Sequence, residues 1–205
     1  MHRSSYERQS IMRNALVWYI RDMRVTPEQA ALVSAVLAFA NLRPLRSVAQ
    51  VQKLFRAVPG ATAVFQTIPA KDLPAFKQDQ RDVRDWLAAI ATREAERIRA
   101  VEHAVSQLFP KTVISVYSLE RHTVHWVFPG VQACYVAGVA LILTRPLALA
   151  RRLGQCRAPL EGADGICGRF RLDLAGKPRR YCNDEHRRRF DAADAARRVR
   201  KMRGG

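Results

Sequence analysis

The chain has 205 residues, of which 48% are hydrophobic and 26% charged, and its formal net charge at pH 7 is +17. This length suits one medium domain with a small appendage, and the hydrophobic fraction is high enough for a packed core, which excludes a wholly disordered chain. Because 35 Lys and Arg outnumber 18 Asp and Glu, we expect a polyanion, above all nucleic acid, as the partner. An anionic membrane surface and a merely solvated basic surface are the alternatives.

Helical periodicity dominates residues 1–150. Helices are expected over residues 10–24, 26–40, 47–58 and 79–108, with an irregular connection or short helix over residues 61–74. The second helix has the clearest start, because Thr26 can cap it, Pro27 suits its first position and Gln29 can close a capping box. We therefore predict an α-rich N-terminal domain.

Two short runs, residues 112–117 and 123–128, are rich in β-branched and aromatic residues and are separated by a polar stretch, which predicts a β-hairpin. His122 and His125 lie here. Their offset of three residues points them to opposite faces of a strand, so we assign them a structural role rather than metal ligation.

The segment over residues 126–143 approaches the length of a membrane span. Its purely apolar part is only about 13 residues long, whereas a transmembrane helix needs roughly 20. We therefore expect a buried helix, with Cys134 as a core residue, and keep a membrane-associated protein as a minor alternative. A short helix over residues 147–153 should follow it.

Three of the four cysteines, Cys156, Cys167 and Cys182, fall within 27 residues, and His186 follows the last of them. Cys182 and His186 are four residues apart at the start of a helix expected over residues 183–202, so both project from the same side of its first turn. Ten residues separate Cys156 from Cys167, against about two to four in compact zinc knuckles. Pro and Gly residues between them allow the chain to fold back as an enlarged knuckle.

Thiolates and a neutral imidazole at four tetrahedral corners form a site suited to zinc. Buried free thiols or disulfides are the alternatives. The flanking Gly, Pro and Arg residues leave little apolar material to bury three thiols. The first eight residues are polar and charged rather than those of a signal peptide, which favours a reducing cytoplasm over disulfides. We predict one structural Zn²⁺.

Between the two ligand pairs, residues 170–174 alternate apolar and polar side chains, residues 175–178 supply turn chemistry, and residues 179–181 follow, which predicts a second β-hairpin. A knuckle, a hairpin and a helix that carries the last ligands stand in the order of a treble-clef-like zinc module. In such a module the metal replaces much of the core that about 50 residues cannot build, so metal binding and folding are coupled.

This C-terminal segment resembles the CGNR zinc finger family, whose members join an ABATE-like N-terminal domain to a C-terminal zinc finger. The matching residues are Cys156, Cys167, Gly168, Phe170, Asp173, Arg179, Arg180, Tyr181 and Cys182. The name-giving Cys-Gly-Asn-Arg stretch is absent, and Glu185-His186-Arg187 stands where the last cysteine of the family falls. The resemblance covers roughly the last quarter of the chain, and it implies a bacterial transcription regulator that binds DNA.

Positive charge is concentrated in the same region, because residues 151–205 hold 16 Lys and Arg against 7 Asp and Glu. Within the expected helix, Arg187 with Asp191 and Asp194 with Arg198 are spaced to pair at i,i+4. The candidates for phosphate contacts are Arg179, Arg180, Arg188, Arg189, Arg200, Lys201 and Arg203.

No phosphate-binding glycine loop, nucleophile elbow or metalloprotease motif occurs, so we do not expect an enzyme. We predict an α+β protein with two domains. Residues 1–150 form a mostly helical domain with a β-hairpin that senses a signal or dimerises, and residues 151–205 form a treble-clef-like zinc finger that contacts double-stranded DNA. The expected location is the cytoplasm, at the nucleoid. A sequence-nonspecific RNA-binding or nucleoid-associated protein, and an adaptor in which zinc is purely structural, are the alternatives.

Overall fold

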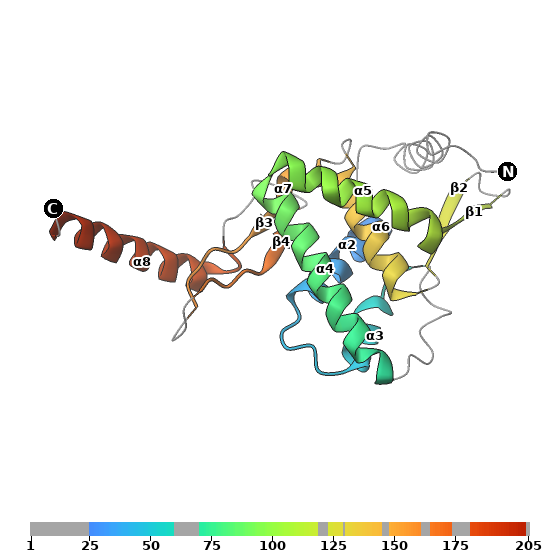
Figure 1. Ribbon diagram of the computed structural model, residues 1–205, viewed down its shortest axis with the longest axis horizontal. Helices are drawn as coiled ribbons and strands as arrows, with labels where there is room; N and C mark the ends of the chain where they lie inside the picture. The colour runs from blue at the N-terminus through green and yellow to red at the C-terminus, as the bar shows by residue number, and fades with distance from the viewer. Residues whose placement is uncertain are drawn as a thin grey trace. The chain divides into compact units, whose positions relative to one another are not determined.

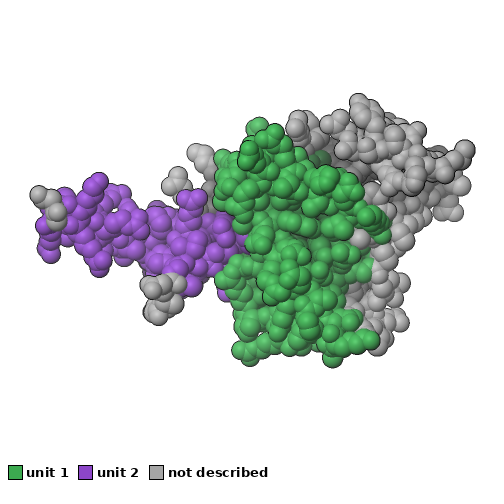
Figure 2. Space-filling view, viewed as in Figure 1, with its two compact units in different colours: residues 1–151 green, residues 152–205 purple. Residues whose placement is uncertain are grey.

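The computed structural model describes residues 25–59, 70–118, 123–128, 130–144, 148–160, 165–173 and 181–203. It is mostly helical and carries two two-stranded antiparallel sheets in these ranges. The chain divides into two compact units, residues 1–151 and 152–205, which Figure 2 shows in green and purple. The helix predicted over residues 10–24, most of the connection over 61–74, and Arg179 and Arg180 lie outside the described residues.

The first unit is built from helices and one hairpin (Figure 1). Its elements are α2 (Pro27–Asn41), α3 (Val48–Phe55), the 3-10 turn η1 (Ala70–Asp72), α4 (Leu73–Thr92), α5 (Ala95–Thr112), β1 (Ile114–Ser118), β2 (Thr123–Val127) and α6 (Val131–Leu143). The short helix α7 (Leu149–Arg152) leads into the second unit, which contains β3 (Leu153–Gln155), β4 (Phe170–Leu172) and α8 (Asp184–Arg203).

The predicted capping box opens α2. The Gln29 N–H donates to Thr26 Oγ1 at 3.3 Å, and the Thr26 N–H donates to Gln29 Oε1 at 3.0 Å. At the other end of α2, side chains of α4 donate to carbonyl groups near the helix C-terminus. Gln80 Nε2 donates to the carbonyls of Phe39 at 2.6 Å and Leu42 at 2.8 Å. Both ends of the helix are therefore fixed by side chains.

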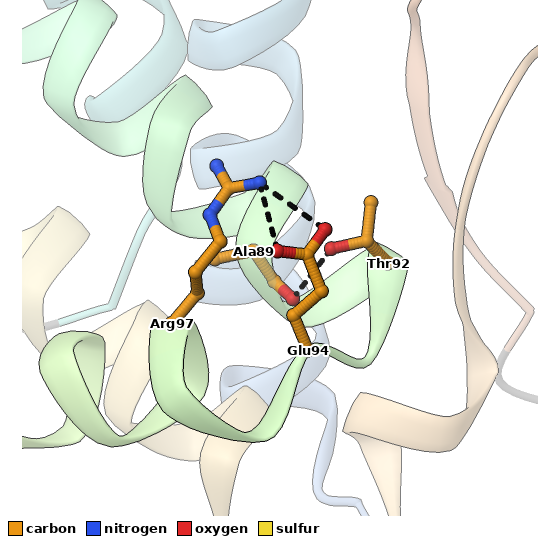
Figure 3. Close-up of polar contacts among 4 residues, drawn as sticks. All are labelled: Ala89, Thr92, Glu94 and Arg97. Atoms are coloured by element: carbon orange, nitrogen blue, oxygen red, sulfur yellow. Dashed lines mark hydrogen bonds and ion pairs between the residues drawn. The ribbon is translucent and has the colours of Figure 1, made fainter.

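The single long helix expected over residues 79–108 is in fact two helices, α4 and α5, which meet at a sharp corner (Figure 1). Arg93 has a φ of 61°, a left-handed conformation that ends α4. Figure 3 shows the polar contacts at this corner: Thr92 Oγ1 donates to the Ala89 carbonyl at 3.1 Å, and Arg97 pairs with Glu94 at 3.4 Å. The break contains neither Gly nor Pro, so sequence pattern alone missed it.

The helix α6 lies at the centre of the first unit, where it packs against α2, α3, α4 and α5. Cys134 is fully buried in α6, as predicted. Gly138 lets α6 approach α2 closely, because a Cβ at this position would lie 2.5 Å from Val36 Cγ2. Within the described residues, no helix combines the length and the apolar character that crossing a bilayer requires.

The predicted hairpin of the first unit forms, with β1 and β2 antiparallel and Val116 opposite His125. His122 and the side chain of His125 lie outside what the structure describes.

Phe170–Leu172 forms a strand, as predicted, and it pairs with β3, a strand that was not predicted and whose first residue, Leu153, was expected to end a helix. The predicted turn over residues 175–178 and most of the predicted partner over 179–181 lie outside the described residues. The register pairs Leu153 with Leu172 and Gln155 with Phe170. Leu153 and Phe170 are both buried, so this pairing encloses the only large apolar side chains that are buried in the described part of the second unit.

Candidate metal centre

The sheet of β3 and β4 continues as a ladder of backbone hydrogen bonds up to the first two cysteines. The Cys156 N–H donates to the Arg169 carbonyl at 2.8 Å, the Gly168 N–H to the Cys156 carbonyl at 3.0 Å, and the Cys167 N–H to the Ala158 carbonyl at 2.7 Å. These bonds fix the two cysteines on neighbouring segments that extend β3 and β4.

The ten residues between Cys156 and Cys167 do not push the cysteines apart. Pro159 and Ile166 form a further antiparallel bridge, and the Leu160 N–H donates to the Gly165 carbonyl at 3.2 Å. The wide spacing is therefore taken up by an extension of the hairpin away from the cysteines.

Gly168 makes the turn after Cys167. Its φ is 62°, in the left-handed region that a residue with a Cβ adopts only at a cost. Because the Gly168 N–H also bonds to the Cys156 carbonyl, this residue locks the second cysteine against the first. Glycine is thus the residue best suited to the position directly after this candidate ligand.

The other two candidate ligands lie at the start of α8. Asn183 caps this helix, because its Oδ1 accepts from the His186 N–H at 2.8 Å. Asp184 and Glu185 occupy the first turn, where negative charge is favourable. Cys182 directly precedes the cap and His186 is in the first turn, so the cap fixes both side chains relative to the knuckle.

Cys156, Cys167, Cys182 and His186, the ligand cluster, come together with all four potential ligand atoms within 4.8 Å of one another. Cys156 Sγ lies 3.5 Å from His186 Nδ1, and Cys167 Sγ lies 3.7 Å from Cys182 Sγ. A tetrahedral zinc site with ordinary bond lengths has S···N edges of about 3.6 Å and S···S edges of about 3.8 Å. The cluster could therefore hold one metal ion.

The four cysteines are all free. The separation of 3.7 Å between the sulfurs of Cys167 and Cys182 is far longer than the roughly 2.05 Å of a disulfide bond. The thiols are also not simply core residues of a large apolar cluster. Among the residues that the structure describes, Ala158 is the only other fully buried residue of their cluster, and Tyr181 adds partial cover. Of the cysteines in the cluster, Cys156 and Cys167 are buried and Cys182 is half-buried.

The thiols differ in acidity. Burial alone would raise the pKa of Cys156, but hydrogen bonds from the Ala158 N–H, from His186 and from Cys182 outweigh it and lower this pKa to about 7. Burial raises the pKa of Cys182 to about 12, and the neighbouring Cys156 and Cys167 add to that rise. Without a cation, one thiolate forms readily, and its negative charge opposes the ionisation of the next thiol. A bound divalent cation supplies the positive charge that lets several thiolates coexist.

The predicted ion pairs along α8 form: Arg187 pairs with Asp191 at 3.9 Å, and Arg198 with Asp194 at 2.7 Å. Arg189 was expected to lack a partner, but it pairs with Glu185 one turn earlier.

A second set of α8 cations is exposed and forms no ion pair with any residue that the structure describes. These residues are Arg188, Arg197, Arg200, Lys201 and Arg203. The sequence interpretation missed Arg197, which is spaced three residues from both Asp194 and Arg200 and was not assigned to either role. It also missed two groups that support the cluster, the side-chain cap of Asn183 and the backbone N–H of Ala158.

The cluster and the cationic helix share His186, which is both a candidate ligand and part of the first turn of α8. Function must be inferred from this geometry and charge, because no protein-family model matches the chain and no curated protein matches it.

Proposed function

We propose that the protein is a zinc-stabilised DNA-binding protein that regulates transcription and contacts the duplex through α8. The observation that carries this proposal is the position of the ligand cluster, which lies at the N-terminus of a helix bearing five exposed, unpaired cations among the described residues. The cluster anchors the helix, and the helix supplies the charge.

The donor set argues for zinc. Three sulfurs and one imidazole nitrogen suit a borderline-soft ion with tetrahedral geometry. Four protein ligands leave no open position for a reacting water, which favours a structural site over a catalytic one. Beyond Cys156, Ala158 and Cys167, the buried apolar residues described in the second unit are only Leu153 and Phe170. So small a core needs a metal to hold it.

The order of the elements supports a treble-clef-like module. A knuckle supplies Cys156 and Cys167, and the start of a helix supplies Cys182 and His186. The resemblance of these residues to the CGNR zinc finger family points the same way.

The helix α8 is suited to a polyanion. None of its residues is buried, so its surface is open to a ligand. At about 1.5 Å per residue its 20 residues span about 30 Å, and the major groove of DNA admits an α-helix. Each cation that neutralises a phosphate releases counterions, which makes the binding strongly dependent on salt.

A second candidate is sequence-nonspecific binding of DNA or RNA. Besides His186, α8 carries no neutral hydrogen-bonding side chain, since it contains no Asn, Gln, Ser or Thr. Arginine and lysine contact phosphates more often than bases, so this composition favours contacts to the backbone.

The test is a salt titration of duplex binding by fluorescence anisotropy. The variant Arg197→Gln/Arg200→Gln/Lys201→Gln removes three unpaired cations of α8, and Lys53→Gln/Lys71→Gln/Lys77→Gln removes three exposed cations of the first unit as the matched control. For three phosphate contacts, the slope of log affinity against log salt should become shallower by about 2.7 in the α8 variant alone. Equal slopes in the wild type and the α8 variant would contradict the proposal. A selection from random duplexes then separates a regulator from a general binder.

A further inference from the structure

The three cysteines of the ligand cluster are not equivalent. Cys156 is fully buried, and its sulfur faces His186 Nδ1 at 3.5 Å and accepts from the Ala158 N–H. Cys167 is 7% exposed, and its sulfur lies 3.7 Å from that of Cys182, which is the most exposed of the three. Cys182 also interacts with Cys156, but Cys156 is fully buried, so Cys167 and Cys182 form the close pair that contains the two more exposed thiols.

We propose that the ligand cluster is a redox-releasable metal site, in which a peroxide converts Cys167 and Cys182 into a disulfide and the metal is expelled. The proposal rests on the metal binding inferred above, but not on nucleic-acid binding. It assigns different roles to the two cysteines: Cys182 is oxidised first, and Cys167 then resolves the sulfenic acid.

The reaction balances with hydrogen peroxide as the oxidant. The pKa of Cys182 is raised in the metal-free cluster, but a cysteine that ligates zinc is a thiolate. In the zinc-loaded protein the sulfur of Cys182 attacks one peroxide oxygen; an S–O bond forms, the O–O bond breaks, and hydroxide leaves and is protonated to water. The sulfur of Cys167 then attacks the sulfenic sulfur of Cys182. An S–S bond forms, the S–O bond breaks, and a second water leaves. Two thiols are oxidised by two electrons in total, and one peroxide is reduced to two waters.

The geometry requires little motion. The sulfurs must approach by about 1.7 Å to reach a disulfide bond length. Cys156 is a poorer resolving thiol, because its sulfur is held by His186 and by the Ala158 N–H. Disulfide formation leaves only Cys156 and His186 as ligands, and two protein ligands do not complete a tetrahedral zinc site.

Cys134 provides an internal control. It is fully buried in α6, and burial raises its pKa to about 12, so it should stay reduced under the same treatment. The variant Cys134→Ala removes this thiol without touching the ligand cluster.

The experiment exposes purified, zinc-loaded, full-length protein and its Cys134→Ala variant to hydrogen peroxide. A chromogenic chelator measures released zinc, and peptide mass spectrometry under non-reducing conditions identifies the disulfide. Release of about one zinc per chain with a Cys167–Cys182 bridge in both proteins, reversed by a thiol reductant and added zinc, is expected.

Three results would overturn the proposal: zinc that stays bound, a dominant bridge that includes Cys156, or zinc lost with the cysteines as sulfinic acids. Protein that takes up no zinc at all would instead contradict the proposed metal site. Loss of zinc and formation of the predicted bridge in a protein that binds no DNA would leave this inference standing and contradict only the proposed function.

Discussion

Replacing Gly168 with alanine adds one carbon atom, the Cβ, and we expect that atom to weaken metal binding. Its φ of 62° costs an L-residue with a Cβ roughly 1–2 kcal/mol relative to glycine. The turn at Gly168 holds Cys167 beside Cys156 through the hydrogen bond from the Gly168 N–H to the Cys156 carbonyl, so this cost should appear in the free energy of metal binding. Gly168→Ala is therefore expected to weaken zinc binding about 5- to 30-fold.

A competition titration between the protein and a chromogenic chelator measures this affinity. Gly130→Ala is the matched control, because Gly130 has an extended backbone with a φ of −169° and nothing within 4 Å of an added Cβ. It should bind zinc as the wild type does. If Gly168→Ala also binds zinc with unchanged affinity, the turn does not position the ligands and the reasoning fails.

His186→Ala should lower zinc affinity at least about tenfold and remove the nitrogen ligand from the spectrum of the cobalt-substituted protein. His186→Cys should keep four ligands. Equal zinc affinities for wild type and His186→Ala would exclude His186 as a ligand. Gly138→Ala should destabilise the first unit by about 1–3 kcal/mol, because the added Cβ meets Val36. Adding Val36→Ala to the same chain should recover part of the loss in Tm. An unchanged Tm in Gly138→Ala would refute the close packing of α6 against α2. Burial raises the pKa of Asp79 in the folded protein. The stability that this carboxyl contributes is therefore fully present below the ordinary pKa of 3.8, and it is lost as pH rises through the pKa of Asp79 in the folded state. Asp79→Asn should therefore have a higher Tm than wild type at pH 7 and the same Tm near pH 3, and a lower Tm at pH 7 would count against this.

The features that sequence predicted well are those that a few neighbouring residues determine. The Thr26–Gln29 capping box needs only a four-residue segment, and the hairpin of β1 and β2 follows from β-branched runs on either side of a polar stretch. The same holds for Cys182 and His186, whose spacing alone puts them on one side of a helix start. The proximity of all four cluster residues could be predicted because three thiols and one imidazole are a ligand set suited to zinc.

The features that sequence missed depend on contacts between distant segments. The break at Arg93 has no glycine or proline to announce it, and it is supported by contacts such as Thr92 to the Ala89 carbonyl. The pairing of Phe170–Leu172 with Leu153–Gln155 was not predicted, because the turn residues that follow Phe170–Leu172 suggested a downstream partner, whereas this partner precedes Cys156. Choice of strand partner is a tertiary property, and local propensity carries little information about it.

Charge pairing on α8 shows the same limit on a smaller scale. Two of its i,i+4 pairs were predicted from spacing, but the third, between Arg189 and Glu185, was overlooked although its spacing is identical. Because Arg189 is paired, most of the unpaired cations that could contact a polyanion lie in the C-terminal half of the helix, where Arg197, Arg200 and Lys201 are found.

The central claim is that Cys156, Cys167, Cys182 and His186 together bind one zinc ion and so hold α8 in place. X-ray absorption at the zinc edge of the purified full-length protein tests it most directly. The account predicts one zinc per chain with three sulfur neighbours at about 2.3 Å and one nitrogen neighbour at about 2.0–2.1 Å. A protein that takes up no zinc, or a zinc shell dominated by oxygen and nitrogen, would contradict it.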